Sequence, residues 1–289
     1  MAINVRKLGH ALGAEVSGVD LSRPIDDQTF GEINRAFLAN CVLVFRGQSL
    51  TREQHVAFSR RFGQLDNNLA RSAHMRTPEV PEIFLVTAEP VPSGQTPGGV
   101  IGDDWHTDNS HLPVAAAASL LRALELPDVG GDTMFCNMYR AWESLSPLYR
   151  EWLDGRFALH DMSVARETQA QRTPAELEDI RRRNPPVYQP IARRHDVTGR
   201  KALYVSEMTT VSIEGLTAEE SAPILAFLYE HSTPHENVYR HVWKPADMIL
   251  WDNRCVMHIA LADYDLAERR TMYRTTLRGD PSGRIAATA

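Results

Sequence analysis

A short pair of candidate metal ligands and one distant histidine constrain the fold more than any other feature. His106 and Asp108 stand two residues apart, so on an extended strand their side chains project from the same face. A third candidate ligand, His258, lies far along the chain. Only a fold that brings distant strands side by side can place all three around one ion.

The chemistry of these three side chains indicates a metal site with open positions. Two imidazoles and one carboxylate are the protein ligands of non-haem Fe(II) oxygenases, in which one face of the ion stays free. The same donors can hold Zn²⁺ with an open water position, as in hydrolases, or a metal that takes no part in catalysis. A His-x-Asp tripeptide by itself is also compatible with a polar loop. The three residues alone leave these interpretations open.

A run of β-forming residues near the end of the chain places two arginines on one face. In an extended strand, Arg270 and Arg274 share one parity and Tyr273 has the other. A buried guanidinium needs an anion, because an unpaired buried charge is destabilising. The pair therefore predicts a site for a dicarboxylate cosubstrate. The open alternative is that the arginines face solvent or pair with acidic neighbours, which are Asp263, Asp265 and Glu268.

Short, distinctive sequence motifs are distributed over nearly the whole chain. They are residues 13–21, 45–48 and 58–63, then Trp105-His106-Thr107-Asp108, Gly130-Gly131-Asp132-Thr133, Trp251-Asp252-Asn253-Arg254-x-x-x-His258 and Arg269-Arg270-x-x-x-Arg274. In these blocks the sequence resembles the taurine/2-oxoglutarate dioxygenase family, TauD/TfdA.

The resemblance implies a reaction and a role for each matching residue. The His-x-Asp pair and His258 would be catalytic and would bind Fe(II). Thr133 and Arg270 would hold the distal carboxylate of 2-oxoglutarate, and Arg274 would lie beside the cosubstrate or contact an acidic group of the substrate. The implied reaction uses 2-oxoglutarate and O₂, releases succinate and carbon dioxide, and hydroxylates a substrate C–H bond. Some hydroxylated products of this family then fragment.

Departures from the taurine-specific pattern lead us to expect another small organic acid. Arg71 and His74 stand where taurine enzymes carry a histidine and a tyrosine, and Gly102 stands where they place an asparagine. The residues that lead into the His-x-Asp motif are more similar to members that cleave aryloxyalkanoate ethers. We expect Arg71, His74, His111 and Arg274 to receive a carboxylate, sulfonate or sulfate.

Helix and strand signals alternate along the chain and predict a mixed α+β fold. Threonine N-caps with Gln or Glu three residues later predict helices after Thr51, Thr173 and Thr217. Short runs bounded by Gly, Pro, Asn or Asp predict strands at 15–19, 41–45, 116–122, 201–205, 247–251 and 270–277. This order indicates a distorted double-stranded β-helix (jelly roll, cupin-like) flanked by helices. Because no linker divides the chain, residues 1–289 are expected to form one domain.

Two segments and several histidines fall outside this pattern. Residues 89–104, rich in Pro and Gly, predict a lid over the site or an ordinary surface loop, and residues 161–172 a second irregular segment. His231, His235 and His241 are interpreted as a helix end and surface loop, because Pro234 breaks the helix. His160 is a possible pocket residue.

Charge and hydropathy exclude other classes of protein. The net charge of −6 is not that of a nucleic-acid binder, and no apolar stretch is long enough to span a membrane. The N-terminal segment lacks the apolar core of a signal peptide. Three cysteines without metal-ligand spacing indicate buried thiols in a reducing compartment. We expect a soluble, cytoplasmic enzyme of small molecules that forms a homo-oligomer, either a dimer or a tetramer.

Overall fold

The computed structural model describes residues 3–66, 76–77, 79–87, 102–165, 172–265 and 267–286. Most of the predicted lid at 89–104 lies outside the described residues, and so does the middle of the irregular segment 161–172. Arg71 and His74 also lie outside them.

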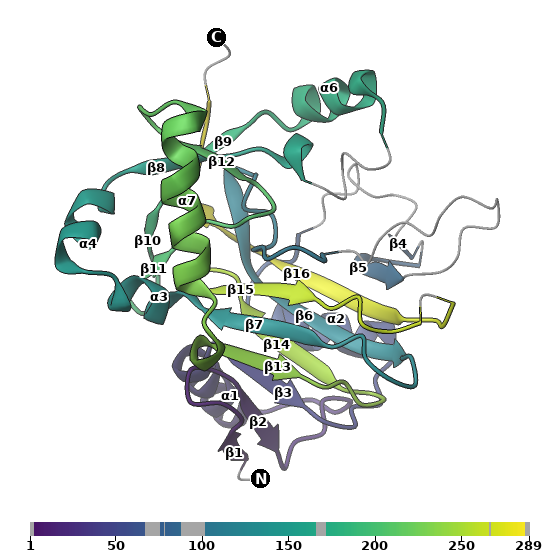
Figure 1. The fold of residues 1–289 in the computed structure, drawn as a ribbon. Coiled ribbons are helices and arrows are strands. Elements are labelled where there is room, and N and C mark those ends of the chain that lie inside the picture. Colours follow the sequence, from purple (N-terminus) through teal and green to yellow (C-terminus); the bar gives the residue numbers. More distant parts are fainter. Residues whose placement is uncertain are drawn as a thin grey trace.

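A large sheet of eight strands forms the framework of the molecule (Figure 1). In spatial order its strands are β1 (Asn4–Lys7), β2 (Ala14–Ser17), β3 (Val42–Phe45), β14 (Met248–Asp252), β6 (Val114–Glu125), β16 (Thr271–Pro281), β5 (Val80–Thr87) and β4 (Arg76–Thr77). All neighbours are antiparallel except β2 and β3, which are parallel. The two central neighbours of β6 come from the last part of the chain, so the fold joins residues that are far apart in sequence.

A smaller antiparallel sheet faces the large one and carries the distant histidine. Its order is β13 (Val238–His241), β7 (Thr133–Asn137) and β15 (Val256–Ala260). One isolated bridge joins His106 to His258 at the open edge of this sheet. The two residues exchange both backbone hydrogen bonds, at 3.0 and 2.8 Å.

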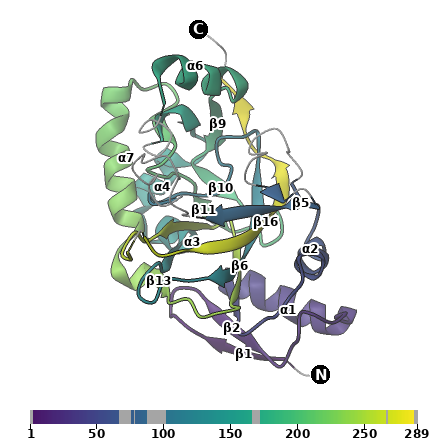
Figure 2. The same ribbon diagram turned by 90° about the vertical axis from the view of Figure 1, so that its right-hand side faces the viewer.

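Successive side chains along each strand point to opposite faces of the large sheet, so the core has two parts. Side chains on one face of the large sheet pack towards the smaller sheet; they include Val42, Val44, Leu121, Ile249, Trp251 and Met272, with Phe135 from β7. Side chains of the opposite parity pack against α1 (Asp27–Asn40) and α2 (Arg52–Arg60); they include Leu43, Phe45, Leu120, Leu250 and Leu277. Figure 2 shows these two helices on one side of the large sheet and α7 on the opposite side of the molecule.

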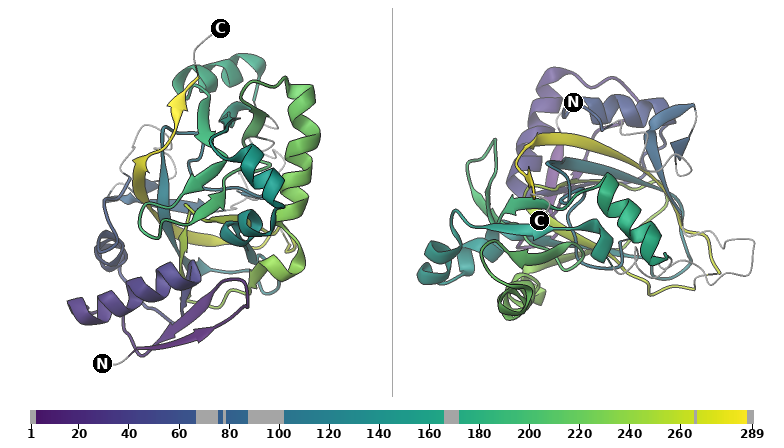
Figure 3. Two further views of the ribbon diagram at one scale, coloured as in Figure 1. Left: turned by 90° about the vertical axis from the view of Figure 1, so that its left-hand side faces the viewer. Right: turned by 90° about the horizontal axis from the view of Figure 1, so that it is seen from above.

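The remaining elements cover the other side of the core (Figure 3). The helices there are α3 (Met138–Ser144), α4 (Pro147–Leu153), α6 (Pro174–Arg183) and α7 (Ala218–Ser232), with short 3-10 turns at Met162–Val164 and His235–Asn237. A four-stranded sheet orders β12 (Thr210–Ile213), β8 (Phe157–His160), β9 (Val187–Pro190) and β17 (Arg284–Ile285), and β10 (Ala192–Arg194) pairs with β11 (Lys201–Leu203).

The predicted α+β composition is confirmed, and so are the three predicted helix starts. Thr51, Thr173 and Thr217 each form a capping box, in which threonine and the residue three positions later bond to each other's backbone N–H groups. Each of the six predicted strands overlaps a strand of the structure. No helix in the described part of the chain is long and apolar enough to cross a membrane.

One expectation about the additional histidines is wrong. His231 does lie in the last turn of α7, as predicted. His241 is not in a surface loop but in β13, where it is fully buried and its Nε2 lies 3.2 Å from Asp247 Oδ2. Pro234 ends the helix as expected, but after a 3-10 turn that contains His235 the chain continues as β13, which pairs with β7.

Candidate active site

His106, Asp108 and His258 come together as the candidate metal centre. One ligand atom from each lies within 4.8 Å of the others, and all three residues are buried. The Nε2 atoms of His106 and His258 lie 3.9 and 4.0 Å from Asp108 Oδ1. In the described part of the chain, no other group of three His, Cys, Asp or Glu residues is arranged in this way.

Neighbouring groups fix the orientation of both imidazoles. His106 Nδ1 lies 2.8 Å from the carbonyl oxygen of Asp104. A carbonyl only accepts, so Nδ1 carries the proton and Nε2 presents its lone pair to the site. The ring of His258 packs 4.7 Å from Trp251 and 6.2 Å from Phe135, measured between centroids. These aromatic side chains form the apolar wall behind the ligands.

The protonation states are those that bind a metal ion. Burial raises the pKa of Asp108, but the positive charge of Arg274, aided by the hydrogen bond from Ser119, outweighs it and holds the pKa well below its ordinary range. Burial, followed by the neighbouring His106, lowers the pKa of His258 well below its ordinary value. The site therefore combines a carboxylate with a neutral imidazole, as metal coordination requires.

Gly102 allows the chain to pass close to His106. Its φ of +82° lies in the left-handed region, and a Cβ atom there would come within 2.7 Å of His106 Cε1. Its carbonyl oxygen accepts a hydrogen bond from the N–H of Ala260, which lies two residues after His258. A larger residue at this position would displace the imidazole.

Arg270 is a buried guanidinium without a carboxylate partner among the described residues. It is 3% exposed, and its hydrogen bond runs from Nε to the carbonyl oxygen of Gly131, at 3.0 Å. The nearby carboxylates of Asp132 and Asp263 are already engaged, because Arg240 donates to them at 2.7 and 2.6 Å. Burial lowers the pKa of Arg270. Its two terminal nitrogens are suited to a carboxylate that comes from outside the chain.

The alternative interpretation was that the two arginines pair with nearby acidic residues. Those acidic residues have other hydrogen-bond partners. Asp265 and Glu268 accept hydrogen bonds from backbone N–H groups. Asp263 bonds to Arg240 and to the backbone of the Gly-Gly block.

The Gly-Gly-Asp-Thr block lies directly against Arg270. Gly131 has a φ of +68°, and a Cβ atom there would come within 3.2 Å of the Arg270 side chain. Thr133 is buried on β7, on the same face as Phe135, which pairs with His258. The Thr133 hydroxyl accepts from Trp243 Nε1 at 3.0 Å, so its own proton remains for another acceptor.

Arg274 contacts the carboxylate of the candidate metal ligand Asp108 directly. Its Nη1 donates to Asp108 Oδ1 at 3.0 Å, and its guanidinium lies over the ring of Phe84. Met272, which shares its parity in β16, is in the core between the two sheets, while Tyr273 packs on the other face. Arg274 lies on β16, as predicted, whereas Arg270 lies just before the strand begins.

Two more predicted pocket residues, His111 and His160, are both buried. His111 lies in the turn that follows Asp108. His160 ends β8 and is buried, with Nδ1 3.2 Å from the hydroxyls of Ser110 and Thr209. Burial lowers the pKa of His160 to about 3, which makes it a neutral, hydrogen-bonded core residue.

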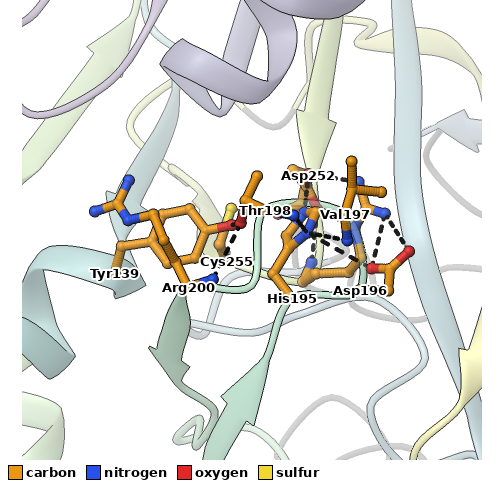
Figure 4. A network of polar contacts seen from close by, with 9 residues as sticks. Tyr139, His195, Asp196, Val197, Thr198, Arg200, Asp252 and Cys255 are labelled. Atoms are coloured by element: carbon orange, nitrogen blue, oxygen red, sulfur yellow. Dashed lines mark hydrogen bonds and ion pairs between the residues drawn. The ribbon is translucent and has the colours of Figure 1, made fainter.

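Sequence reasoning missed the structural role of the turn after β14. Asp252 accepts from Arg254 at 2.8 and 2.7 Å. His195 Nε2 lies 2.9 Å from Asp252 Oδ2 (Figure 4). Arg254 also binds Asp196, so the turn is tied to the loop between β10 and β11. The block Trp251-Asp252-Asn253-Arg254 signalled the importance of this turn but not the contacts it makes.

Comparison with known proteins agrees with this geometry. The model of the Taurine catabolism dioxygenase TauD, TfdA family matches residues 4–276. The chain belongs to the TauD/TfdA family. It is accordingly a 2-oxoglutarate-dependent dioxygenase, and the recognition made from sequence blocks is confirmed.

Three relatives of this TauD/TfdA member show how far the similarity extends. An alpha-ketoglutarate-dependent 2,4-dichlorophenoxyacetate dioxygenase of Cupriavidus pinatubonensis is 34% identical, over 97% of this chain and 99% of the relative. An (S)-phenoxypropionate/alpha-ketoglutarate-dioxygenase of Sphingobium herbicidovorans is 32% identical, over 99% of this chain and 98% of the relative. The crystal structure of AAD-2 in complex with Mn(II) and N-oxalylglycine superimposes with a TM-score of 0.84 at 30% identity, covering 98% of this chain and 99% of that one.

Proposed function

We propose that this protein is an Fe(II)-dependent dioxygenase that consumes 2-oxoglutarate and hydroxylates a small organic acid. The observation that carries the proposal is the buried Arg270 guanidinium, which has no carboxylate partner among the described residues, together with the buried His-Asp-His cluster. The cluster supplies the donors of a metal with open positions, and Arg270 supplies the counter-charge for a dicarboxylate.

The two other functions considered from sequence explain less of the site. A zinc hydrolase could use the same three ligands, and so could a protein whose metal is not catalytic. Neither has a use for a buried guanidinium that the carboxylates in the described part of the chain leave unpaired. Arg270 therefore favours the oxygenase.

We assign the residues of the site as follows. His106, Asp108 and His258 would hold Fe(II), which together with 2-oxoglutarate and O₂ would supply the oxidant for a C–H bond. Arg270 would bind the distal carboxylate through its fork of N–H donors, and the Thr133 hydroxyl would add one more donor. The aromatic wall of Trp251 and Phe135 would keep water away from this region.

We also propose a finer description of the fold. The large sheet and the facing sheet β13-β7-β15, with the His106–His258 bridge at its edge, would together form a distorted double-stranded β-helix. Residues 1–289 would make up one domain. The core between the two sheets supports this view, because strands from both halves of the chain contribute to it.

Among organic acids, we propose aryloxyalkanoates as the first substrate class, with alkyl sulfates and sulfonates as the alternatives. The two dioxygenase relatives are named for 2,4-dichlorophenoxyacetate and (S)-phenoxypropionate, and this supports the order. Arg274 has the charge to receive the acidic head group, and Arg71, His74 and His111 stay predicted as further contacts. Hydroxylation beside an ether or sulfate oxygen would lead the product to fragment.

Substrate-stimulated release of succinate tests this proposal. Aryloxyalkanoates, alkyl sulfates and sulfonates are each compared with the uncharged amide or ester of the same tail. We expect stimulation by acids and little by their neutral analogues, because the partly buried guanidinium of Arg274 discriminates by charge. Equal stimulation by neutral analogues would remove the organic-acid assignment, and no 2-oxoglutarate turnover with any compound would weaken the oxygenase assignment itself.

The expected quaternary structure and location stay predictions. We propose a homo-oligomer, either a dimer or a tetramer, that works in the cytoplasm on small molecules. Light scattering of the purified protein would report the mass of the assembly, and a monomer at micromolar concentration would contradict the prediction.

A further inference from the structure

A directed chain of hydrogen bonds leads from the core to the candidate metal ligand Asp108. Trp251 Nε1 donates to Asn253 Oδ1 at 2.9 Å, and Asn253 Nδ2 donates to Ser119 Oγ at 2.9 Å. Ser119 Oγ in turn donates to Asp108 Oδ2 at 2.6 Å. The backbone N–H of Asp108 closes the path by donating to Asn253 Oδ1 at 3.4 Å.

The chemistry of the indole decides the direction of this chain. Trp251 is a donor only, so the amide oxygen of Asn253 must face it and the amide nitrogen must face Ser119. Ser119 Oγ accepts from that nitrogen, which leaves the hydroxyl proton for the carboxylate. Ser119 and Asn253 are both 0% exposed, so water does not compete for these groups.

The strand pairing places the chain where it can act on the site. Trp251 and Ser119 are opposite each other in the register of β14 and β6. Ser119 has the parity of Leu121 and therefore faces the core between the two sheets. The ring of Trp251 also packs 4.7 Å from His258, so one side chain supports two of the three candidate ligands.

We propose that Ser119 and Asn253 are positioning residues that hold Asp108 in one orientation for the metal. Ser119 engages Oδ2, whereas Oδ1, which also accepts from Arg274 Nη1, is the oxygen nearest to both imidazole Nε2 atoms. A carboxylate held in this way binds with one oxygen and does not have to be ordered when the ion arrives. This inference rests on the proposed function, because it assigns a role within the same metal site.

The test is the affinity of the full-length protein for Mn(II) in the absence of 2-oxoglutarate. Ser119→Ala removes the donor to Asp108 and little volume, and we expect the Mn(II) affinity to fall by roughly tenfold. Ser232→Ala is the matched control, because Ser232 is equally buried but its hydroxyl donates to the carbonyl oxygen of Leu228. The control should bind Mn(II) like the wild type, while both variants lose similar thermal stability in the metal-free state.

Two further measurements separate positioning from a general structural effect. The d–d absorption of bound Co(II), which reports ligand geometry, should change in Ser119→Ala and not in Ser232→Ala. The double variant Ser119→Ala/Asn253→Ala should lose less Mn(II) affinity than the sum of the losses in the two single variants, because both residues act on Asp108 through the shared Ser119 hydroxyl.

The outcomes distinguish this inference from the function on which it rests. A wild-type protein that binds no Mn(II) would contradict the metal site. A wild type that binds, with Ser119→Ala losing no more affinity than Ser232→Ala, would overturn only the positioning role. If Ser119→Ala does not fold, Trp251→Phe replaces it: loss of the indole donor should weaken Mn(II) binding, and unchanged binding would overturn the proposal.

Discussion

At the scale of single residues, the site is defined by which buried charges are paired within the chain and which are not. Arg240 binds Asp132 and Asp263, and Arg254 binds Asp252 and Asp196, so these charges are satisfied. Arg270 is more deeply buried than Arg240 or Arg254 but has no such partner among the described residues. This difference marks Arg270 as the position where a ligand must complete the structure.

Replacing Arg270 should therefore affect the cosubstrate before anything else. Arg270→Lys keeps the charge but loses the planar fork, so the affinity for 2-oxoglutarate should fall by about tenfold or more, equivalent to about 1.4 kcal/mol. Calorimetric titration of the Mn(II)-loaded protein measures this. Arg269→Lys is the matched control, since Arg269 is an exposed neighbour whose nearest carboxylate, on Glu125, is 3.9 Å away. Equal affinities in the two variants would end the assignment of Arg270.

Loss of any one candidate metal ligand should abolish turnover. His106→Ala, Asp108→Ala and His258→Ala each remove one of three protein donors, and we expect no succinate formation above background. Circular dichroism should show that each variant keeps its secondary structure, because the sheets extend well beyond the site. Normal turnover in Asp108→Ala would exclude this carboxylate from the metal centre.

At the scale of helices and strands, local signals were readable from sequence and long-range pairing was not. The capping boxes at Thr51, Thr173 and Thr217 involve residues three apart, so their chemistry is visible in the sequence. The sheet β13-β7-β15 was not predicted, because most of its residues are buried and its strands lack polar alternation. The same limit applies to Ser119, whose role depends on a register with Trp251 that no local pattern reveals.

The cap of α7 offers a test that should leave the site untouched. Thr217→Ala removes the side-chain acceptor for the N–H of Glu220, so the free energy of unfolding should fall by about 1 kcal/mol. Thr217→Ser keeps the hydroxyl and should stay close to the wild type. Chemical denaturation measures both, and Mn(II) affinity should be unchanged in each. A larger loss in the serine variant than in the alanine variant would contradict the capping role.

At the scale of the whole molecule, the buried ion network around Asp252 should contribute to the dependence of stability on pH. Burial raises the pKa of Asp252, but Arg254 and His195 outweigh it and lower the pKa from 3.8 to about 2. A lowered pKa in the folded state adds stability above the ordinary pKa, and this stability is lost as the pH falls towards the folded value. The expected window therefore lies between pH 3.8 and about 2.

Replacing the Asp252 carboxylate should make the free energy of unfolding depend less on pH in acid. Asp252→Asn should be less stable than the wild type at neutral pH, and the difference should shrink as the pH falls through that window. Denaturation by urea at a series of pH values measures this, with the exposed Asp128→Asn as the control. A constant difference between variant and wild type at every pH would contradict the assignment.

The most direct test of the whole interpretation is anaerobic titration of the protein with Fe(II) and 2-oxoglutarate, followed by visible absorption. Chelation of Fe(II) by the 2-oxo acid gives a weak charge-transfer band. We expect this band to saturate at one equivalent of each component, to be absent in Asp108→Ala, and to need more 2-oxoglutarate in Arg270→Lys. A folded wild-type protein that gives no band at saturating Fe(II) and 2-oxoglutarate would contradict the assignment of this site.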